Sequence, residues 1–481
     1  MSGSITLRDV TVVDPRDGSL APAMDVTVAG ERIVSVVPTG GGTAGGTADG
    51  TTNGGTVVDA AGQYVVPGYL DMHAHPLGPK DPAGSLELML ANGITGFRQM
   101  AGSAKLLEQR RAGTLPIPPN APELLLMPGE ILNPLNAGTA ETAVATVRRQ
   151  KANGADFIKV GFVTPPVFFA AQAEASRLGI PIVGHLPTGI DVVAASRGGM
   201  KSIEHLGPGV GILAGCSTAE VEIVERLASA PSRLKAPPFK VPFAEKIAAR
   251  VIRKLVVNPS LMAGDVDVEV LRRAIDTFDE DKALALAARF VADGTWQVPT
   301  LIRERTSELS DDPEYRDDPN LRYVAEPTLR QWREASGKFA ALAAPVKATF
   351  RDAYALRMRI TGLFDRAGVK ILAGSDSCGA GWEVPGFALH QEFDQLAKAG
   401  LSPLRVLQTV TSDAAAFLDA GDTRGAVEPG KAADLVLLGA NPLERTDHLH
   451  DIRGVLRAGR FHSRDDLEAI KGRVAAARSV T

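Results

Sequence analysis

The residues with the clearest chemical meaning are His73 and His75, a closely spaced pair in a chain that has only eight histidines. They end the apolar segment GQYVVPGYLDMHAH, residues 62–75, whose β-branched and aromatic side chains favour a strand. Side chains two positions apart in a strand point to the same side. Both imidazoles should therefore face the same way, as two ligands of one metal ion would.

Four other residues could complete a site around this pair, because each lies in or directly after another short apolar segment. They are Lys159 within ADFIKVGF, His185 after GIPIVG, His205 after MKSIE and Asp376 after GVKILAGS. Imidazole nitrogens and a carboxylate are good ligands for a borderline divalent metal ion. We therefore expect a metal site wherever the fold brings these segment ends together.

Each of these residues also has an ordinary explanation when it is taken alone. A histidine at a strand end is most often a hydrogen-bonded core or surface residue. Lys159 could pair with a carboxylate or extend its amine to solvent, and Asp376 after Gly-Ser could cap a helix. Their joint occurrence at the ends of five predicted strands favours the metal site over these separate explanations.

The elements that must position these residues alternate between short apolar segments and helical patterns from Gly68 to about Leu418. Eight predicted strands in this order indicate a (β/α)8 TIM barrel in the α/β class, which gathers its active site at the carboxyl ends of the strands. The predicted strands are YVVPGYLDMHAH, GITGFRQM, PELLLM, ADFIKVGF, GIPIVGH, MKSIEH, TWQVPTLI and GVKILAGSD.

Both ends of the chain have the alternating pattern of β-strands. We predict that residues 1–66 and 423–481 form one small β-sandwich subdomain around a barrel at 67–422. A glycine- and threonine-rich loop at 39–55 interrupts the N-terminal strands and should be mobile. A long insertion at about 207–293 and a polar stretch, SELSDDPEYRDDPN, should lie over the barrel.

Composition narrows the classes of function. The 481 residues carry a net charge of -4, so no basic surface for nucleic acid is expected. Two cysteines cannot build a disulfide framework or a cysteine-based zinc site. No signal-peptide pattern or membrane-length apolar stretch is present, so we predict a cytoplasmic protein that acts on a small molecule without nucleic-acid or membrane partners, with self-association left open.

These motifs together resemble the amidohydrolase superfamily, and within it the imidazolonepropionase-like and Xaa-dipeptidase (prolidase-like) branch. The resemblance covers nearly the whole chain. It rests on PGYLDMHAH, GADFIKV, PIVGHL, SIEHLG and AGSDS, followed by GLSPLRVLQTVTSDAAAFLD and GAVEPGKAADLVLL.

The resemblance implies a site with two divalent metal ions, zinc being the metal that suits the ligands. It implies that His73 and His75 bind the buried metal with Asp376 beside it, that His185 and His205 bind the more exposed one, and that Lys159 is carboxylated by CO2 to a carbamate. It further implies a hydrolase that cleaves a C–N bond, amide or peptide-like, through a metal-bridged hydroxide, with Asp376 as the catalytic proton shuttle.

The pocket and the substrate are less constrained by the sequence. Candidate substrate contacts are Arg98, Gln99, Gln297 and Trp382, although packing explains each of them at least as well. The stretch after Lys159, GFVTPP, lacks the tyrosine that several dipeptidase-like relatives carry. Hydrolysis of a lactone or phosphotriester, a non-hydrolytic lyase and a non-catalytic barrel are the alternatives.

Overall fold

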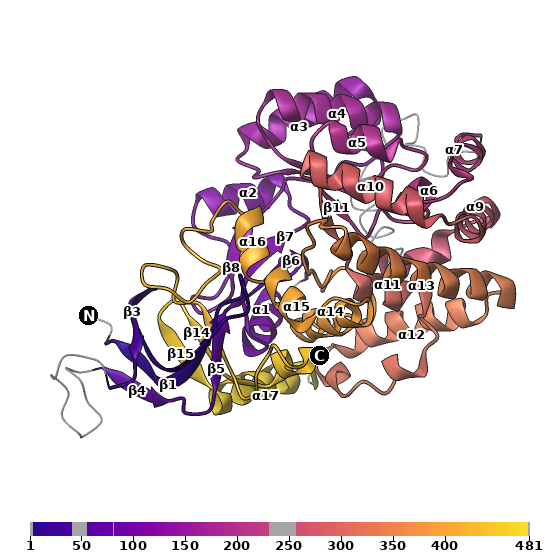
Figure 1. Ribbon diagram of the computed structural model, residues 1–481. Coiled ribbons are helices and arrows are strands. Elements are labelled where there is room, and N and C mark those ends of the chain that lie inside the picture. The colour runs from indigo at the N-terminus through magenta and orange to yellow at the C-terminus, as the bar shows by residue number, and fades with distance from the viewer. Residues whose placement is uncertain (1–2, 41–54, 80, 230–255, 480–481) are drawn as a thin grey trace.

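The computed structural model describes residues 3–40, 55–79, 81–229 and 256–479, which form a mixed α/β structure (Figure 1). Strands of these residues belong to one eight-stranded sheet, one four-stranded sheet and one three-stranded sheet. The two smaller sheets are parallel and carry the candidate ligands. None of the helices in these ranges is both long and apolar enough to cross a membrane.

The eight-stranded sheet is made from both ends of the chain. Its order is β15-β14-β13-β5-β1-β2-β3, with β4 also paired to β1. In Figure 1 the indigo N-terminal strands and the yellow C-terminal strands lie side by side. The strands are β1 (Ile5–Val13), β2 (Leu20–Ala29), β3 (Arg32–Pro38), β4 (Thr56–Asp59), β5 (Tyr64–Pro67), β13 (Leu435–Leu438), β14 (Ile452–Arg457) and β15 (Arg460–Ser463).

The first parallel sheet contains β6 (Tyr69–Ala74), β7 (Ile94–Gln99) and β8 (Glu123–Leu126), in that order. The second contains β9 (Ile158–Val160), β10 (Ile182–Gly184), β11 (Met200–Glu204) and β12 (Trp296–Val298). An isolated bridge pairs Leu132, which follows β8 in the chain, with Val160 of β9. The strand predicted at GVKILAGSD appears only as single bridges, from Ile371 to Gln297 and from Ser377 to Ala74.

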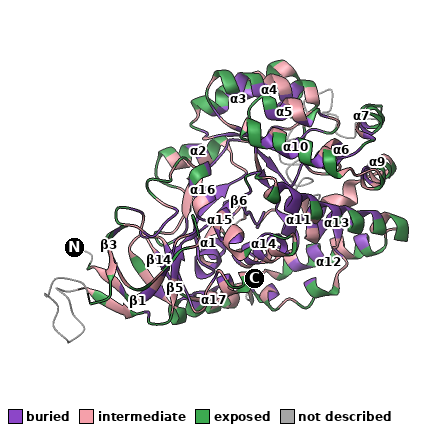
Figure 2. Ribbon diagram, in the orientation of Figure 1, coloured by how far each residue is buried: buried purple, intermediate pink, exposed green. Residues whose placement is uncertain are grey.

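A helix follows most of the parallel strands. Helix α3 starts with a capping box at Thr139, has Glu141 in its first turn and ends with Arg149 and Lys151, charges that suit the helix dipole. Helices and strands bury the faces that they turn toward each other (Figure 2). The helices of this part include α1 (Pro82–Ala91), α2 (Ala104–Arg111), α3 (Ala140–Ala152), α4 (Pro165–Arg177), α5 (Val192–Arg197), α14 (Phe387–Lys398), α15 (Pro403–Thr409) and α16 (Ser412–Phe417).

The predicted insertion is helical where it is described. It contains α6 (Gly211–Gly215), α7 (Glu220–Ala228), the 3-10 turn η1 (Pro259–Met262), α9 (Asp265–Asp276) and α10 (Glu280–Asp293). Its proline-rich KAPPFKVPF segment lies outside the described residues, as does most of the loop at 39–55. The helix that ends the chain, α17 (Arg464–Ser479), was not expected from the sequence.

The segment TWQVPTLI is only partly a strand. Helix α11 (Leu301–Glu308) starts at its last two residues, so the prediction of a strand through Ile302 is wrong. The polar stretch that follows contains the end of α11 and two short 3-10 turns, η2 (Pro313–Tyr315) and η3 (Pro319–Tyr323). Two long helices follow, α12 (Glu326–Ala340) and α13 (Ala344–Arg366). The second ends shortly before Ile371, which forms the bridge to Gln297.

Candidate metal centre

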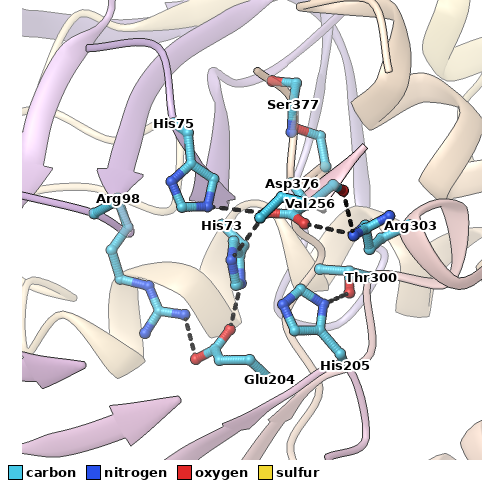
Figure 3. A network of polar contacts seen from close by, with 12 residues as sticks. His73, His75, Arg98, Glu204, His205, Val256, Thr300, Arg303, Asp376 and Ser377 are labelled. Carbon is cyan, nitrogen blue, oxygen red and sulfur yellow. Dashed lines mark hydrogen bonds and ion pairs between the residues drawn. The ribbon is translucent and has the colours of Figure 1, made fainter. Parts of the chain in front are cut away.

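Three of the predicted ligands meet at the end of β6. One donor atom each of His73, His75 and Asp376 can be chosen so that all lie within 4.8 Å of one another. Asp376 Oδ1 lies 3.2 Å from His73 Nε2 and 2.9 Å from His75 Nε2 (Figure 3). This spacing suits three ligands around one cation.

Backbone and side-chain hydrogen bonds place Asp376 against β6. The amide of Asp376 donates to His73 O at 2.7 Å. Asp71 accepts hydrogen bonds from the amide and the hydroxyl of Ser375, at 3.1 and 2.6 Å. Asp376 itself has a positive φ of 51°, so it lies in a turn, and none of the described helices begins there as a capping role would require.

His185 and His205 stand beside this group. The ring centroids of His73 and His205 are 4.6 Å apart, and those of His205 and His185 are 5.2 Å apart. The Nδ1 atom of His205 is hydrogen-bonded to Thr300 Oγ1 at 2.5 Å, which fixes the ring. The four histidines therefore form one continuous cluster, built from the ends of β6, β10 and β11.

Lys159 is buried in β9, opposite Val183 of β10. Its Nζ makes no hydrogen bond to any described residue. Burial lowers the pKa of Lys159 to about 8, against the attraction of Glu204 and Asp376. A buried amine without a partner is costly unless another group binds it, so this position calls for a modification or a ligand.

The electrostatics of the cluster favour neutral imidazoles and an ionised carboxylate. Burial holds the pKa values of His185 and His205 well below the usual range and lowers that of His75. Burial would raise the pKa of Asp376, but the histidines around it, His73 above all, hold it well below its ordinary value. Free imidazole lone pairs and a carboxylate are the forms that bind metal ions.

Two charged residues that were not predicted as part of the site contact it directly. Glu204, in β11, lies 2.6 Å from His73 Nδ1. Arg303, in α11, lies 3.1 Å from the second oxygen of Asp376. A signal for Glu204 was present in the sequence, since it stands directly before His205 in an apolar strand. No sequence signal pointed to Arg303, because the residues that begin its helix were expected to end a strand.

Arg98 and Gln99 are buried and occupied by contacts within the protein. Arg98 donates to Glu204 and to Met72 O, and Gln99 bonds the backbone of Leu77 and Ala101. These contacts hold both side chains within the protein, and their substrate role stays a prediction from the sequence.

Gln297 and Trp382 are both buried. The two amide atoms of Gln297 have no hydrogen-bond partner among the described residues. Trp382 stacks on Tyr315, with ring centroids 5.9 Å apart. The substrate roles of these two residues stay predictions from the sequence.

Comparison with known proteins finds a family model that matches part of the chain. Residues 356–462 match the model of the amidohydrolase family. A curated adenine deaminase of Rubrobacter xylanophilus is 40% identical over 75 residues, which are 16% of this chain and 11% of the relative's length. The predicted resemblance to this superfamily is confirmed.

Two solved structures share the fold of this protein over nearly the whole chain. A bottromycin amidohydrolase has a TM-score of 0.69 and 22% identity, with 99% of this chain and 91% of the other covered. A Xaa-Pro dipeptidase crystallised with methionine in its active site has a TM-score of 0.59 and 16% identity, with 96% and 100% covered. These likenesses concern the fold.

The donor set at the end of β6 fits divalent metal ions. His73, His75 and Asp376 supply two imidazoles and a carboxylate at compatible spacing. The buried Nδ1 of His185 and Nζ of Lys159 have no hydrogen-bond partner among the described residues, so they are free to meet such a group. Nitrogen and oxygen donors without thiolates suit zinc.

Proposed function

We propose that the protein is a metal-dependent hydrolase that cleaves a carbon–nitrogen bond, amide or peptide-like, in a small molecule. The observation that carries the proposal is the convergence of His73, His75 and Asp376 beside the unpartnered Lys159, in a chain that matches the amidohydrolase family model over residues 356–462. A cytoplasmic location and any self-association stay predictions from the sequence.

Together with this function we propose a closed barrel and a β-subdomain made from both ends of the chain. The bridges from Leu132 to Val160, from Gln297 to Ile371 and from Ser377 to Ala74 support a closed (β/α)8 barrel at 67–422, with the residues around Ile371 as its eighth strand. We propose that residues 1–66 and 423–481 form one β-subdomain, because their strands share one sheet. The two packed sheets of a β-sandwich stay a prediction from the sequence.

Two metal ions would be held by residues from four strand ends and the turn at Asp376. We propose that His73, His75 and Asp376 would hold one ion, that His185 and His205 would hold the other, and that Lys159, as its carbamate, would supply a further ligand. Such ions, when bound, lower the pKa of water and polarise a carbonyl oxygen. Zinc is the metal that we expect.

Asp376 transfers the proton in the proposed reaction. Its carboxylate accepts a proton from the attacking water and returns it to the departing nitrogen while the C–N bond breaks, which gives an acid and an amine. Arg303 Nε, 3.1 Å from Asp376 Oδ2, holds the orientation of that carboxylate. Thr300 holds His205 through the bond between its hydroxyl and Nδ1 of the ring.

The test combines metal analysis with a substrate screen. We expect close to two divalent ions per chain, and hydrolysis of at least one class among N-acyl amino acids, dipeptides and lactones that is lost on chelation and regained with zinc. His75→Gln should lose metal, whereas His448→Gln, which alters a histidine of the turn η4 (Thr446–His450), should not. A metal-free protein whose activity is indifferent to chelators contradicts the proposal.

A further inference from the structure

Both ring nitrogens of His73 face a carboxylate. Nε2 lies 3.2 Å from Asp376 Oδ1, on the side of the candidate ligands. Nδ1 lies 2.6 Å from Glu204 Oε2, on the opposite edge of the ring (Figure 3). Only the contact at Nδ1 is a hydrogen bond, since Nε2 has no hydrogen-bond partner among the described residues. An ionised carboxylate only accepts hydrogen bonds, so the imidazole proton lies on Nδ1 and the Nε2 lone pair is left free on the side of Asp376.

Glu204 is itself held by other buried groups. Its Oε1 accepts hydrogen bonds from Arg98 Nη2 at 2.9 Å and from Ser202 Oγ at 2.6 Å. Arg98 also donates from Nε to Met72 O at 2.6 Å, which ties it to the residue before His73. Glu204 and Arg98 are fully buried. A network in which each member has a partner is rigid.

Aromatic rings close the far side of this network. The guanidinium of Arg98 lies 5.0 Å from the ring centre of Phe417 and 5.8 Å from that of Phe157. Arg98 and Glu204 form an ion pair in which both side chains are fully buried. Burying such a pair is costly unless hydrogen bonds satisfy both groups, as those to Met72 and Ser202 do here.

We propose that Glu204 is a positioning residue of the metal centre, with Arg98 as its counter-ion. It acts through His73 by fixing the tautomer and the orientation of the ring. Glu204 is not a ligand itself, because its oxygens are taken by Arg98, Ser202 and His73 and it lies behind the ring as seen from Asp376. The inference rests on the proposed metal-dependent function.

Positioning of this kind makes a distinct prediction for metal affinity. Carboxylate partners of ligating histidines hold the ring in place and make it more basic, and their loss typically weakens metal binding about 10- to 100-fold. In Glu204→Gln the amide must turn its NH2 group either to Arg98 or to His73. In the first case two donors oppose each other, and in the second the tautomer of His73 is reversed.

The first experiment needs no substitution of Glu204. Nitrogen-15 NMR of the metal-free, histidine-labelled wild-type protein reports the tautomer of each imidazole, and His73→Gln identifies the signal of His73. We expect the proton on Nδ1. An Nε2–H tautomer of His73 overturns the proposal, and this result does not depend on how Glu204→Gln folds.

The second experiment measures zinc affinity by competition with a zinc indicator. Glu204→Gln should bind zinc about 10- to 100-fold more weakly than the wild type. The matched control is Glu308→Gln, which also removes a buried carboxylate paired with a buried arginine, Arg357, and should leave zinc affinity unchanged. Equal affinities for Glu204→Gln and the wild type overturn the proposal.

The two proposals fail in different ways. If the wild-type protein takes up no zinc, the metal-dependent function is wrong, while the tautomer of His73 still tests its contact with Glu204. If the wild type binds zinc and Glu204→Gln binds it equally well, the function stands and the positioning role is wrong.

Discussion

Asp376 presents its two oxygens to different neighbours. Oδ1 faces the two histidines of β6, and Oδ2 faces Arg303. A carboxylate in this position can serve as a ligand on one side and exchange a proton on the other. The guanidinium on the second side limits the rotation of the group, so the two roles stay on separate atoms.

Asp376→Asn should separate those roles. The amide keeps the shape and one oxygen donor, so we expect most of the metal to stay bound. It cannot accept the proton of the attacking water, so kcat should fall by about two orders of magnitude or more. Metal analysis and steady-state kinetics on one preparation measure both effects. Near-normal turnover would show that another group carries the proton.

Lys159 should be essential because its reaction with CO2 replaces a cationic amine with an anionic carbamate. Only a neutral amine reacts with CO2, and burial brings the pKa of Lys159 to about 8, so the neutral form is accessible near neutral pH. Lys159→Ala should lose metal and activity together, with partial recovery in the presence of a short carboxylic acid. Lys159→Arg should lose both as well, because a guanidinium stays cationic.

Carbon-13 labelling provides the direct measurement on the unmodified residue. Wild-type protein loaded with metal in labelled bicarbonate should show a carbamate signal that is missing from Lys159→Arg. An active, metal-loaded enzyme with a free amine on Lys159 would disprove the carbamate.

The sequence allowed the candidate ligands at the strand ends to be predicted. It did not reveal the residues that hold those ligands in place. His73, His75 and Asp376 could be grouped because strand spacing and apolar context imply where they point. Arg98 also ends a strand, but its burial beside Phe417 and its pairing with Glu204 depend on contacts between distant segments. No local pattern encodes those contacts.

Helix α11 starts in an unusual way. Thr300 precedes it with a left-handed φ of 44°, and its hydroxyl is hydrogen-bonded to His205 and does not cap the helix. The amide of Ile302 is capped instead by Glu392 Oε2 of α14, at 2.7 Å. The sequence pattern suggested a strand here because the capping group comes from a helix 90 residues away.

Glu392 should make the stability of the protein depend on pH. Burial raises its pKa to about 8 in the folded protein, whereas an unfolded glutamate has a pKa near 4.3. The folded state therefore keeps a proton that the unfolded chain releases. The contribution to stability is fully present below about pH 4 and is lost as the pH rises toward 8.

Glu392→Gln cannot ionise, so it should remove this part of the pH dependence. The free energy of unfolding of the variant relative to the wild type should increase steadily between about pH 4.3 and 8. Urea denaturation at several pH values measures the difference, with Glu108→Gln, on the exposed face of α2, as the control. A constant difference across this range would mean that Glu392 ionises normally.

The predicted eighth strand shows the limit of sequence reasoning for elements. GVKILAGSD has the composition of a strand, yet in the structure it forms only single bridges. The backbone must also turn at Asp376 so that this residue reaches His73. The local sequence does not encode that turn. Element type was predictable where the periodic pattern was long, as in α3 and α4, and less so where tertiary contacts set the backbone.

On the scale of the whole molecule, the large sheet joins the two ends of the chain through β5 and β13. Its core contains Leu7, Val26, Val65, Leu435 and Leu437, contributed by both ends. The alternating pattern of each end could be recognised in the sequence. Their pairing was inferred from the family resemblance and from the need of each half to cover its apolar face.

Leu435→Ala should destabilise the protein as a whole. Leu435 is buried opposite Pro67, and truncating a buried leucine costs about 2–5 kcal/mol. Leu20→Ala, on an exposed position of β2, should change the stability by no more than about 0.5 kcal/mol. Denaturant unfolding, followed by circular dichroism, measures both.

Tryptophan fluorescence can show whether the sheet unfolds with the rest of the chain. All three tryptophans, Trp296, Trp332 and Trp382, lie outside the large sheet. We expect Leu435→Ala to shift the fluorescence transition and the circular dichroism transition equally. A shift in the dichroism signal alone would indicate that the sheet unfolds as a separate unit.

The pairing of β5 with β13 also has a consequence for the order of events during protein synthesis. Strand β5 is followed after a single residue, Gly68, by β6, which carries His73. When the ribosome has made β6, its neighbour β5 still lacks β13, which lies more than 360 residues further along the chain. A nascent chain therefore exposes an unpaired edge of β5 until β13 has been made, and a product truncated before β13 would retain it.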